Sequence, residues 1–166
     1  GLDELGIKET FEAWDVAPED LAEKVATFRE SGFLAGCVTL PHKQAVIPMV
    51  DELTEAAQAV GAVNWIFNRD GKLVGHNTDG SGFLRALKEK AGFDPKGVDA
   101  VVFGAGGAAR AIVYALKNAG VNRLTIANRT VEKAQALASE FSEGRFKPNA
   151  IDMSRDSLSN FVPYAT

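Results

Sequence analysis

A glycine-rich turn between an apolar strand and an alanine-rich helix is the feature that most constrains this fold. The run from Val98 to Phe103 is largely apolar, as expected for a strand covered by helices on both faces. Gly104-Ala105-Gly106-Gly107-Ala108-Ala109 follows it, and the pattern predicts a helix from Ala108 to Asn118. A second strand (Arg123 to Ala127) and a second helix (Val131 to Phe141) come next. This order predicts a parallel α/β sheet.

The spacing G-x-G-x-x-A in this turn is typical of dinucleotide binding. Gly104 permits the tight turn, and Gly106 lets the backbone approach a pyrophosphate. Ala109, in the third position, allows the helix to pack closely on the strand, while the helix N-terminus offers free N–H groups and a positive dipole. The alternative is a glycine turn that serves packing alone.

The end of the second predicted strand distinguishes between the two nicotinamide cofactors. A fold that prefers NAD usually has a carboxylate there for the ribose 2′-hydroxyl. This chain instead has Asn128-Arg129-Thr130, followed by Lys133. A guanidinium can stack on adenine and bind a 2′-phosphate, which a carboxylate would repel. The sequence therefore favours NADP, with solvated charges at a helix start as the alternative.

Composition restricts the partners further. The net charge of −4 argues against nucleic acid or an anionic membrane, although a local basic site for one phosphate remains possible. One cysteine and two histidines leave no disulfide framework, and we expect no metal site. Because the chain shows neither an apolar run of membrane-span length nor a signal peptide, we expect a cytoplasmic protein.

The segment before the glycine turn predicts a separate domain. The turn-forming Asp94-Pro95-Lys96-Gly97 marks the expected boundary, with a domain over residues 1–94 and the dinucleotide-binding domain over 95–166. Residues 147–166 show no clear pattern. The elements expected in the first domain are a helix over Pro18–Arg29, a strand over Leu34–Thr39, a mostly helical Gln44–Val60, a hairpin around Arg69-Asp70-Gly71, and a helix from Asp79 or Gly80 to Lys90.

Three short motifs in this first domain carry polar residues that composition does not explain. Lys43 follows a strand end, Asn64 lies in an apolar strand, and Asp79 lies at a strand-to-helix turn. Oxidation of an alcohol to a ketone needs a group that takes the hydroxyl proton, and a lysine beside a carboxylate in a water-poor cleft can do so. Alternatively, Lys43 is a surface charge and Asp79 a helix N-cap.

These motifs, in this order, resemble the shikimate dehydrogenase family. They are V-T-x-P-x-K at Val38–Lys43, G-A-V-N at Gly61–Asn64, G-x-N-T-D-x-x-G-F at Gly75–Phe83, then the glycine turn and N-R-T. The resemblance spans roughly residues 11–138. It implies an N-terminal α/β substrate domain followed by a Rossmann-type NADP-binding domain. It also implies reversible reduction of 3-dehydroshikimate to shikimate with NADPH, on the route to aromatic amino acids.

The resemblance also implies roles for individual residues. Lys43 and Asp79 would form the catalytic pair, with Lys43 handling the proton. Thr39, Lys43, Asn64 and Asp79 would bind the substrate. The residues implied for NADP are Gly104, Gly106, Gly107, Ala108, Asn128, Arg129 and Thr130, and we expect Ala105 of the same turn and Lys133 to join them.

Two departures from the family pattern leave the substrate open. Cys37 stands where the family usually has Asn, and Trp65 where it usually has Thr, so quinate or broader specificity remains an alternative. Family members also begin earlier and continue later than this chain, so we expect a partial chain in which both domains are incomplete. A non-catalytic NADP-binding module is a further alternative, and the expected assembly is a monomer or a homodimer.

Overall fold

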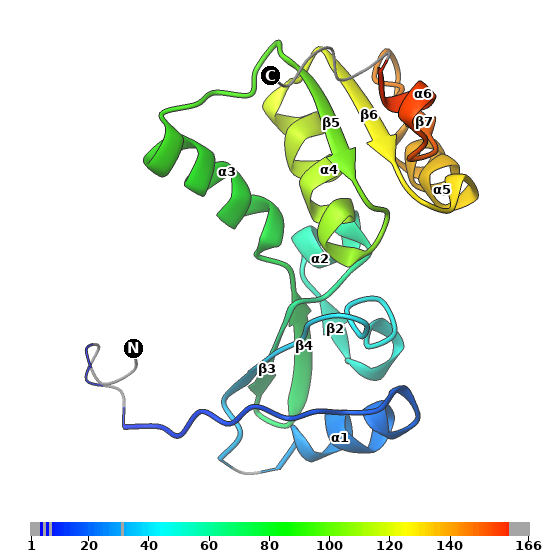
Figure 1. Ribbon diagram of the computed structural model, residues 1–166. Helices are drawn as coiled ribbons and strands as arrows, with labels where there is room; N and C mark the ends of the chain where they lie inside the picture. Colours follow the sequence, from blue (N-terminus) through cyan, green and yellow to red (C-terminus); the bar gives the residue numbers. More distant parts are fainter. Residues whose placement is uncertain (1–3, 5, 7, 31, 160–166) are drawn as a thin grey trace.

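Two sheets, one in each half of the chain, organise the fold (Figure 1). The computed structural model describes residues 4, 6, 8–30 and 32–159. The first sheet has the strand order β1-β3-β4-β2 and the second the order β5-β6-β7. The helix α3 (Asp79–Ala91) leads from the first sheet to the second and lies beside the helix α4 (Gly107–Ala119) (Figure 1). Among the described residues, no helix has the length and apolar character that crossing a membrane requires.

The first sheet is built around a hairpin. Strands β3 (Trp65–Arg69) and β4 (Lys72–His76) pair antiparallel, and β1 (Ala35–Cys37) pairs antiparallel with the outer side of β3. Asp70 and Gly71 at the tip have φ values of 54° and 84°, the backbone that a two-residue type I′ turn requires. The predicted hairpin is therefore confirmed.

The helix predicted over Pro18–Arg29 is confirmed in a shorter form. It begins with a 3₁₀ turn, η2 (Pro18–Asp20), and continues as α1 (Leu21–Thr27). Leu21, Val25 and Phe28 are buried against the sheet, as their spacing indicates.

The prediction of a mostly helical Gln44–Val60, broken near Pro48 and capped by Gly61, is confirmed only for its last part and its cap, and was wrong for the residues before Glu55. Only α2 (Glu55–Val60) is α-helical, Ile47–Met49 forms one 3₁₀ turn (η3), and Glu52–Leu53 forms strand β2, parallel to β4. The backbone N–H groups of Asp51 and Thr54 donate to carbonyl oxygens of β4 at 2.9 Å each, in place of helical acceptors. Pro48, which has no N–H, cannot support a longer helix there.

The second half forms the predicted strand–helix–strand–helix order. Strands β5 (Asp99–Phe103) and β6 (Arg123–Ala127) are parallel, and α4 connects them. Helix α5 (Val131–Phe141) leads to a third parallel strand, β7 (Asn149–Ile151). The segment without a clear pattern thus supplies β7 and a short helix, α6 (Arg155–Ser159). The predicted α/β fold class, with a Rossmann-type second half, is confirmed.

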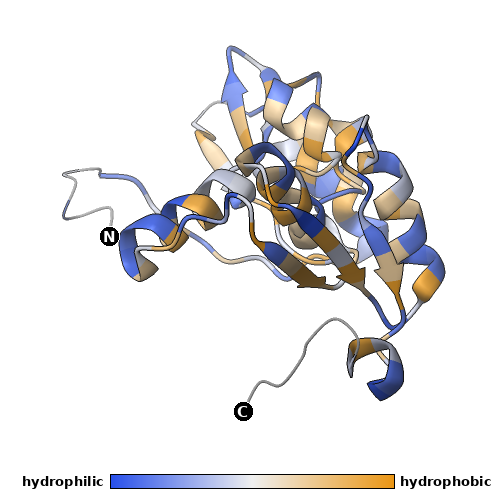
Figure 2. Cartoon of the chain, turned by 90° about the horizontal axis from the view of Figure 1, so that it is seen from above, coloured by the Kyte–Doolittle hydropathy of each residue, from blue (hydrophilic) through white to orange (hydrophobic). Residues whose placement is uncertain are grey.

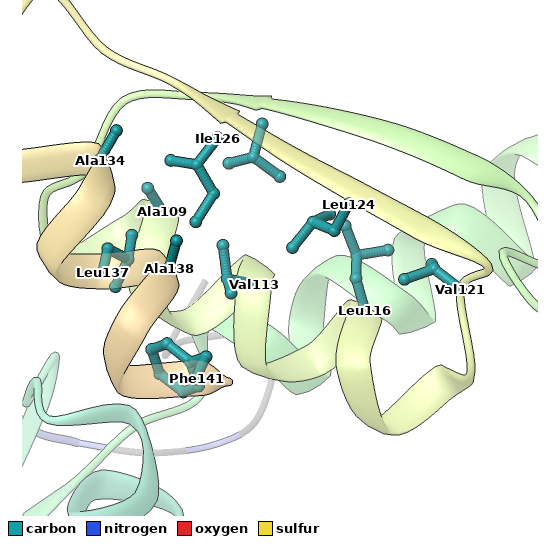
Figure 3. Close-up of a cluster of buried hydrophobic side chains, with 11 residues drawn as sticks. Ala109, Val113, Leu116, Val121, Leu124, Ile126, Ala134, Leu137, Ala138 and Phe141 are labelled. Carbon is teal, nitrogen blue, oxygen red and sulfur yellow. The ribbon is translucent and has the colours of Figure 1, made fainter. Parts of the chain in front are cut away.

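Helices α4 and α5 pack on the second sheet through a cluster of aliphatic residues and one phenylalanine (Figure 3). Val113 of α4, Leu124 and Ile126 of β6, and Leu137 of α5 are almost completely buried. In Figure 2 the strands are largely hydrophobic, whereas the helices carry both hydrophilic and hydrophobic residues. This is the pattern of helices with one face on a sheet and the other in solvent.

Helix α3 begins next to the first sheet and packs on the second half. It begins at Asp79, after β4, and is capped by Gly92 in the left-handed conformation. This agrees with the helix predicted from Asp79 or Gly80 to Lys90. A Cβ on Gly80 would lie 2.8 Å from the carbonyl oxygen of Ala111 in α4, so the two helices touch through backbone. The boundary proposed at Asp94–Gly97 stays a prediction, since α3 before it already contacts the second half.

Candidate functional site

Lys43 and Asp79 form an ion pair at the end of the first sheet. Lys43 Nζ donates a hydrogen bond to Asp79 Oδ2 at 2.7 Å, and the two side chains are only 16% and 24% exposed. Lys43 follows β1 through a tight turn, whereas Asp79 is the first residue of α3. Because both groups are largely withdrawn from water, their attraction is less screened than that of a surface pair. The structure thus brings together the two residues predicted to act on a proton.

Asn64 fixes the second oxygen of this carboxylate. Its Nδ2 donates to Asp79 Oδ1 at 2.8 Å and to Thr78 Oγ1 at 2.9 Å, while its Oδ1 accepts from the Thr78 backbone N–H at 2.9 Å. The Asn64 side chain is buried. Each oxygen of Asp79 therefore has one fixed partner and a lone pair left for a hydroxyl group.

Asn77 is a buried polar residue that the sequence reasoning passed over. Its Nδ2 donates to the Ala62 carbonyl at 3.0 Å, and its Oδ1 accepts from the Asp79 backbone N–H at 3.0 Å. It thus holds the first residue of α3 to the segment before β3. An asparagine directly before Thr-Asp, at the end of an apolar strand, was the available signal.

Backbone hydrogen bonds hold the three motifs side by side. The Val63 N–H donates to the Lys43 carbonyl at 2.7 Å, and the Asn64 N–H donates to the His76 carbonyl at 3.0 Å. Thr39, also predicted to bind substrate, lies two residues after β1 and is exposed. Within the described part of the chain, no hydrogen bond joins its side chain to the Lys43–Asp79–Asn64 cluster.

Cys37 and Trp65 lie directly opposite each other in the pairing of β1 with β3. Both are exposed, and opposite residues of an antiparallel pair share one face of the sheet. Trp65 directly follows Asn64 in the chain, and Cys37 is the cross-strand partner of Trp65. The two departures from the family pattern therefore lie on the strands next to the Lys43–Asp79–Asn64 cluster.

The glycine turn lies next to this cluster. Gly104 has a φ of 105°, which favours glycine, and Gly106 is the extended residue before α4. Gly107, the first residue of α4, faces Lys43: a Cβ on Gly107 would lie 2.9 Å from Lys43 Cβ and 3.5 Å from Ala62 Cβ. The turn and the lysine therefore belong to one contiguous site.

A hollow of about 450 Å³ opens between this turn and the ends of β6 and α5. Six predicted cofactor-binding residues line it, namely Ala105, Gly106, Asn128, Arg129, Thr130 and Lys133. Three others predicted for the pyrophosphate, Gly104, Gly107 and Ala108, are not among the lining residues. The sequence reasoning missed five residues of the wall: Gln44, Arg110, Ala136, Leu137 and Glu140.

The charges around the hollow suit a phosphate. Arg129 and Lys133 are exposed on its wall, and neither has an ion-pair partner among the residues described. Arg110, by contrast, is paired with Glu140. Asn128 Nδ2 donates to the Thr130 carbonyl at 2.8 Å, and this hydrogen bond shapes the loop that carries Arg129. The donor set therefore fits a phosphorylated ribose next to the glycine turn.

A parallel sheet with a glycine turn and a basic hollow defines a dinucleotide-binding α/β protein. Two family models match the chain: the shikimate dehydrogenase substrate binding domain over residues 1–66, and shikimate / quinate 5-dehydrogenase over residues 86–161. The chain belongs to the shikimate dehydrogenase family.

Individual relatives agree with this assignment. The chain is 55% identical over 126 residues to the shikimate dehydrogenase (NADP(+)) of Moorella thermoacetica, covering 76% of this chain and 42% of that protein. The shikimate 5-dehydrogenase of Thermus thermophilus, solved with NADP(H) and shikimate, matches with a TM-score of 0.78 and 37% identity, over 93% of this chain and 60% of that one. The ligand-free 5-ketofructose reductase of a Gluconobacter strain matches with a TM-score of 0.76 and 38% identity, over 90% and 55%. The chain spans about half the length of the curated relatives it matches.

Proposed function

We propose that the complete polypeptide is an NADP-dependent shikimate dehydrogenase, which reversibly reduces 3-dehydroshikimate to shikimate. The observation that carries this proposal is the Lys43–Asp79 pair, fixed by Asn64 and in contact with the glycine turn through Gly107. The names of the relatives support the substrate and the cofactor.

The proposed chemistry assigns the proton to Lys43. NADP(H), when bound, supplies or accepts the hydride. In the direction of reduction, the Lys43 ammonium donates a proton to the carbonyl oxygen while that carbon becomes a secondary alcohol. In the direction of oxidation, the neutral amine takes the hydroxyl proton. Asp79 keeps Nζ aimed at the reacting oxygen through the 2.7 Å hydrogen bond.

Substrate binding is proposed for Thr39, Lys43, Asn64 and Asp79. A polyhydroxylated ring needs several fixed donors and acceptors, and the free lone pairs of the Asp79 carboxylate can accept hydroxyl protons. Asn64 contributes chiefly by holding Asp79 and Thr78 in place. The exposed side chain of Thr39 is free to meet a ring hydroxyl.

The proposed cofactor is NADP rather than NAD. Arg129 and Lys133 have no carboxylate partner in the described part of the chain, so a 2′-phosphate can take both of them as counter-ions. Asn128 and Thr130 lie in the loop at the end of β6, and Ala105 and Gly106 line the same hollow. Gly104, Gly107 and Ala108 shape the turn and the start of α4 rather than the wall of the hollow.

A four-way assay tests the proposal. The complete polypeptide is assayed with shikimate and with quinate, each against NADP and NAD, and shikimate with NADP is expected to give the highest kcat/KM. Lys43→Ala is expected to lower kcat about 100-fold or more while NADP still binds. Lys72→Ala, an exposed lysine at the hairpin, is the matched control. Equal loss of turnover and of NADP binding in Lys43→Ala would remove the assigned role.

A second candidate is a reductase of another polyhydroxylated ketone, with quinate as the first alternative product. The cross-strand pair Cys37 and Trp65 favours it, because both depart from the family pattern on strands that enter the site. The likeness to a 5-ketofructose reductase points the same way. A higher kcat/KM for quinate than for shikimate in the same assay would establish this candidate.

A further inference from the structure

Arg110 is a buried cation that joins the two halves of the chain. It lies in α4, one turn after Gly107, and only 8% of the residue is exposed. Its Nε donates to the Val60 carbonyl, at the end of α2, at 2.8 Å. Its Nη2 pairs with the Glu140 carboxylate of α5. One side chain therefore connects three helices, of which α2 belongs to the first half and α4 and α5 to the second.

The guanidinium fits against the motif that carries Asn64. Gly61, which ends α2 with a φ of 65° and opens G-A-V-N, has no room for a Cβ because Arg110 Nη2 occupies that space. On its other side the Arg110 guanidinium carbon lies 5.7 Å from the centre of the Phe141 ring. The arginine thus packs directly on the segment that positions Asn64, which in turn holds Asp79.

The surroundings argue against Arg110 as a phosphate ligand, although it contributes to the wall of the hollow. Its charge is already balanced by Glu140, and its Nε is committed to a carbonyl. A buried cation without partners is strongly disfavoured, so Arg110 is expected to keep both the Val60 carbonyl and the Glu140 carboxylate. Arg129 and Lys133 are the cations that remain for a phosphate.

We propose that Arg110 is a positioning residue, which holds the start of α4 at a fixed distance from the Gly61–Asn64 segment. Gly107 of the same helix lies against Lys43, and Ala111 contacts Gly80 of α3, so Arg110 is one of several contacts of α4 with the first half. The glycine turn and the Lys43–Asp79 pair are then fixed relative to each other, as hydride transfer at close range requires. The expected effect on catalysis rests on the proposed function, whereas the attachment of α4 to the Gly61–Asn64 segment does not depend on it.

The variant Arg110→Met tests this role in the complete polypeptide. We expect kcat to fall about 10-fold or more, with little change in the KM for NADP, because misplacement of reacting groups slows the chemical step. The kinetic isotope effect with NADPH deuterated at the transferred position should rise, since hydride transfer becomes more rate-limiting. Arg110→Lys, which can still reach one acceptor, should recover part of kcat.

Lys117→Met is the matched control. Lys117 also lies in α4 and forms an ion pair with Glu143 at 2.6 Å, and among the described residues no hydrogen bond or ion pair joins its side chain to α2. We expect its kcat and isotope effect to equal those of the wild type. If Arg110→Met does not fold, Glu140→Gln keeps the arginine and removes its counter-ion, and a smaller change in the same direction is expected.

Amide hydrogen exchange provides a readout that needs no turnover. Exchange over residues 61–64 should become faster in Arg110→Met, or in Glu140→Gln, and stay unchanged in Lys117→Met. Unchanged exchange in the Arg110 and Glu140 variants would overturn the inference. So would a raised KM for NADP with unchanged kcat, which would make Arg110 a phosphate ligand. If the wild type does not oxidise shikimate, the proposed function fails, while exchange still decides the role of Arg110.

Discussion

Gly107 of the glycine turn lies directly against Lys43, with room for a hydrogen but not for a methyl group. A Cβ on Gly107 would approach Lys43 Cβ to 2.9 Å and Lys43 Cδ to 3.3 Å. Gly107, the first residue of α4, therefore limits where the lysine side chain can lie. The glycine at this position has a role in the lysine site as well as in the turn.

Gly107→Ala is expected to displace Lys43. The added methyl must move the lysine stem or the start of α4, because 2.9 Å between two Cβ atoms is closer than such atoms approach in proteins. We expect kcat/KM for shikimate to fall about 10- to 100-fold, as for other small displacements of reacting groups. Steady-state kinetics on the complete polypeptide measure this.

Two other glycines serve as controls for Gly107→Ala. Gly82 in α3 has open space where a Cβ would lie, so Gly82→Ala should leave kcat/KM unchanged. Gly106 also has open space and lines the hollow, so Gly106→Ala should raise the KM for NADP with little effect on kcat. Equal kcat/KM for the Gly107 and Gly82 variants would contradict the steric argument.

Arg129→Ala is expected to weaken NADP far more than NAD. A charge-assisted hydrogen bond to a phosphate contributes roughly 1.5–3 kcal/mol, or about 10- to 100-fold in affinity. NAD lacks this phosphate, so its binding should change little. Arg145→Ala removes an exposed cation that does not line the hollow and is the matched control. Equal weakening of both cofactors, measured by titration, would mean that Arg129 does not bind the 2′-phosphate.

Features within one short motif were predictable from the sequence. The glycine turn, the hairpin at Asp70-Gly71 and the span of α3 follow from local backbone chemistry, and the structure confirms them. The pairing of Lys43 with Asp79 joins two motifs that lie far apart in the chain. It was expected from the resemblance of these motifs to the shikimate dehydrogenase family, and the structure brings the two side chains together.

Features set by partners far along the chain were not predictable. Strand β2 exists because Asp51 and Thr54 donate to β4, and nothing in residues 44–60 alone indicates that partner. Arg110 stands in an apolar helix, where only the distant Val60 carbonyl and Glu140 explain it. A charged residue in such a helix predicts a buried partner, but the sequence does not indicate which residue that partner is.

Asn77→Ala is expected to lower both stability and activity. The side chain is buried, and its loss leaves the Ala62 carbonyl and the Asp79 N–H without their partner, at a cost of about 1–3 kcal/mol. Asp79 then loses part of its orientation, so kcat should fall as well. Asn122→Ala, an exposed asparagine that donates to Asp99, is the control for both readouts. Denaturant unfolding gives the free energy, and a variant as stable as the wild type would contradict this accounting.

Asp51 ties the segment after α1 to the hairpin. The Arg29 guanidinium pairs with its carboxylate, and the Leu73 backbone N–H donates to it at 2.7 Å. The hydrogen bond from Arg29, followed by that from Leu73, holds the pKa of the Asp51 carboxyl below its ordinary value. Arg29 also donates to the Gly71 carbonyl at 3.1 Å, so the pair joins the segment after α1, the residue before β2 and the hairpin turn.

This lowered pKa predicts a component of acid sensitivity. A carboxyl whose pKa is lower in the folded state stabilises the fold above its unfolded pKa, about 3.9 for aspartate, and loses that contribution as the pH falls through the folded pKa. Asp51→Asn should therefore lower the urea midpoint at pH 7. Between pH 5 and the acid limit of folding, the urea midpoint of this variant should fall less than that of the wild type. Asp70→Asn, at the exposed hairpin tip with a φ of 54° that asparagine also adopts, should leave the pH 7 midpoint unchanged. Parallel pH profiles for the wild type and Asp51→Asn would show that the Arg29–Asp51 pair does not contribute to stability.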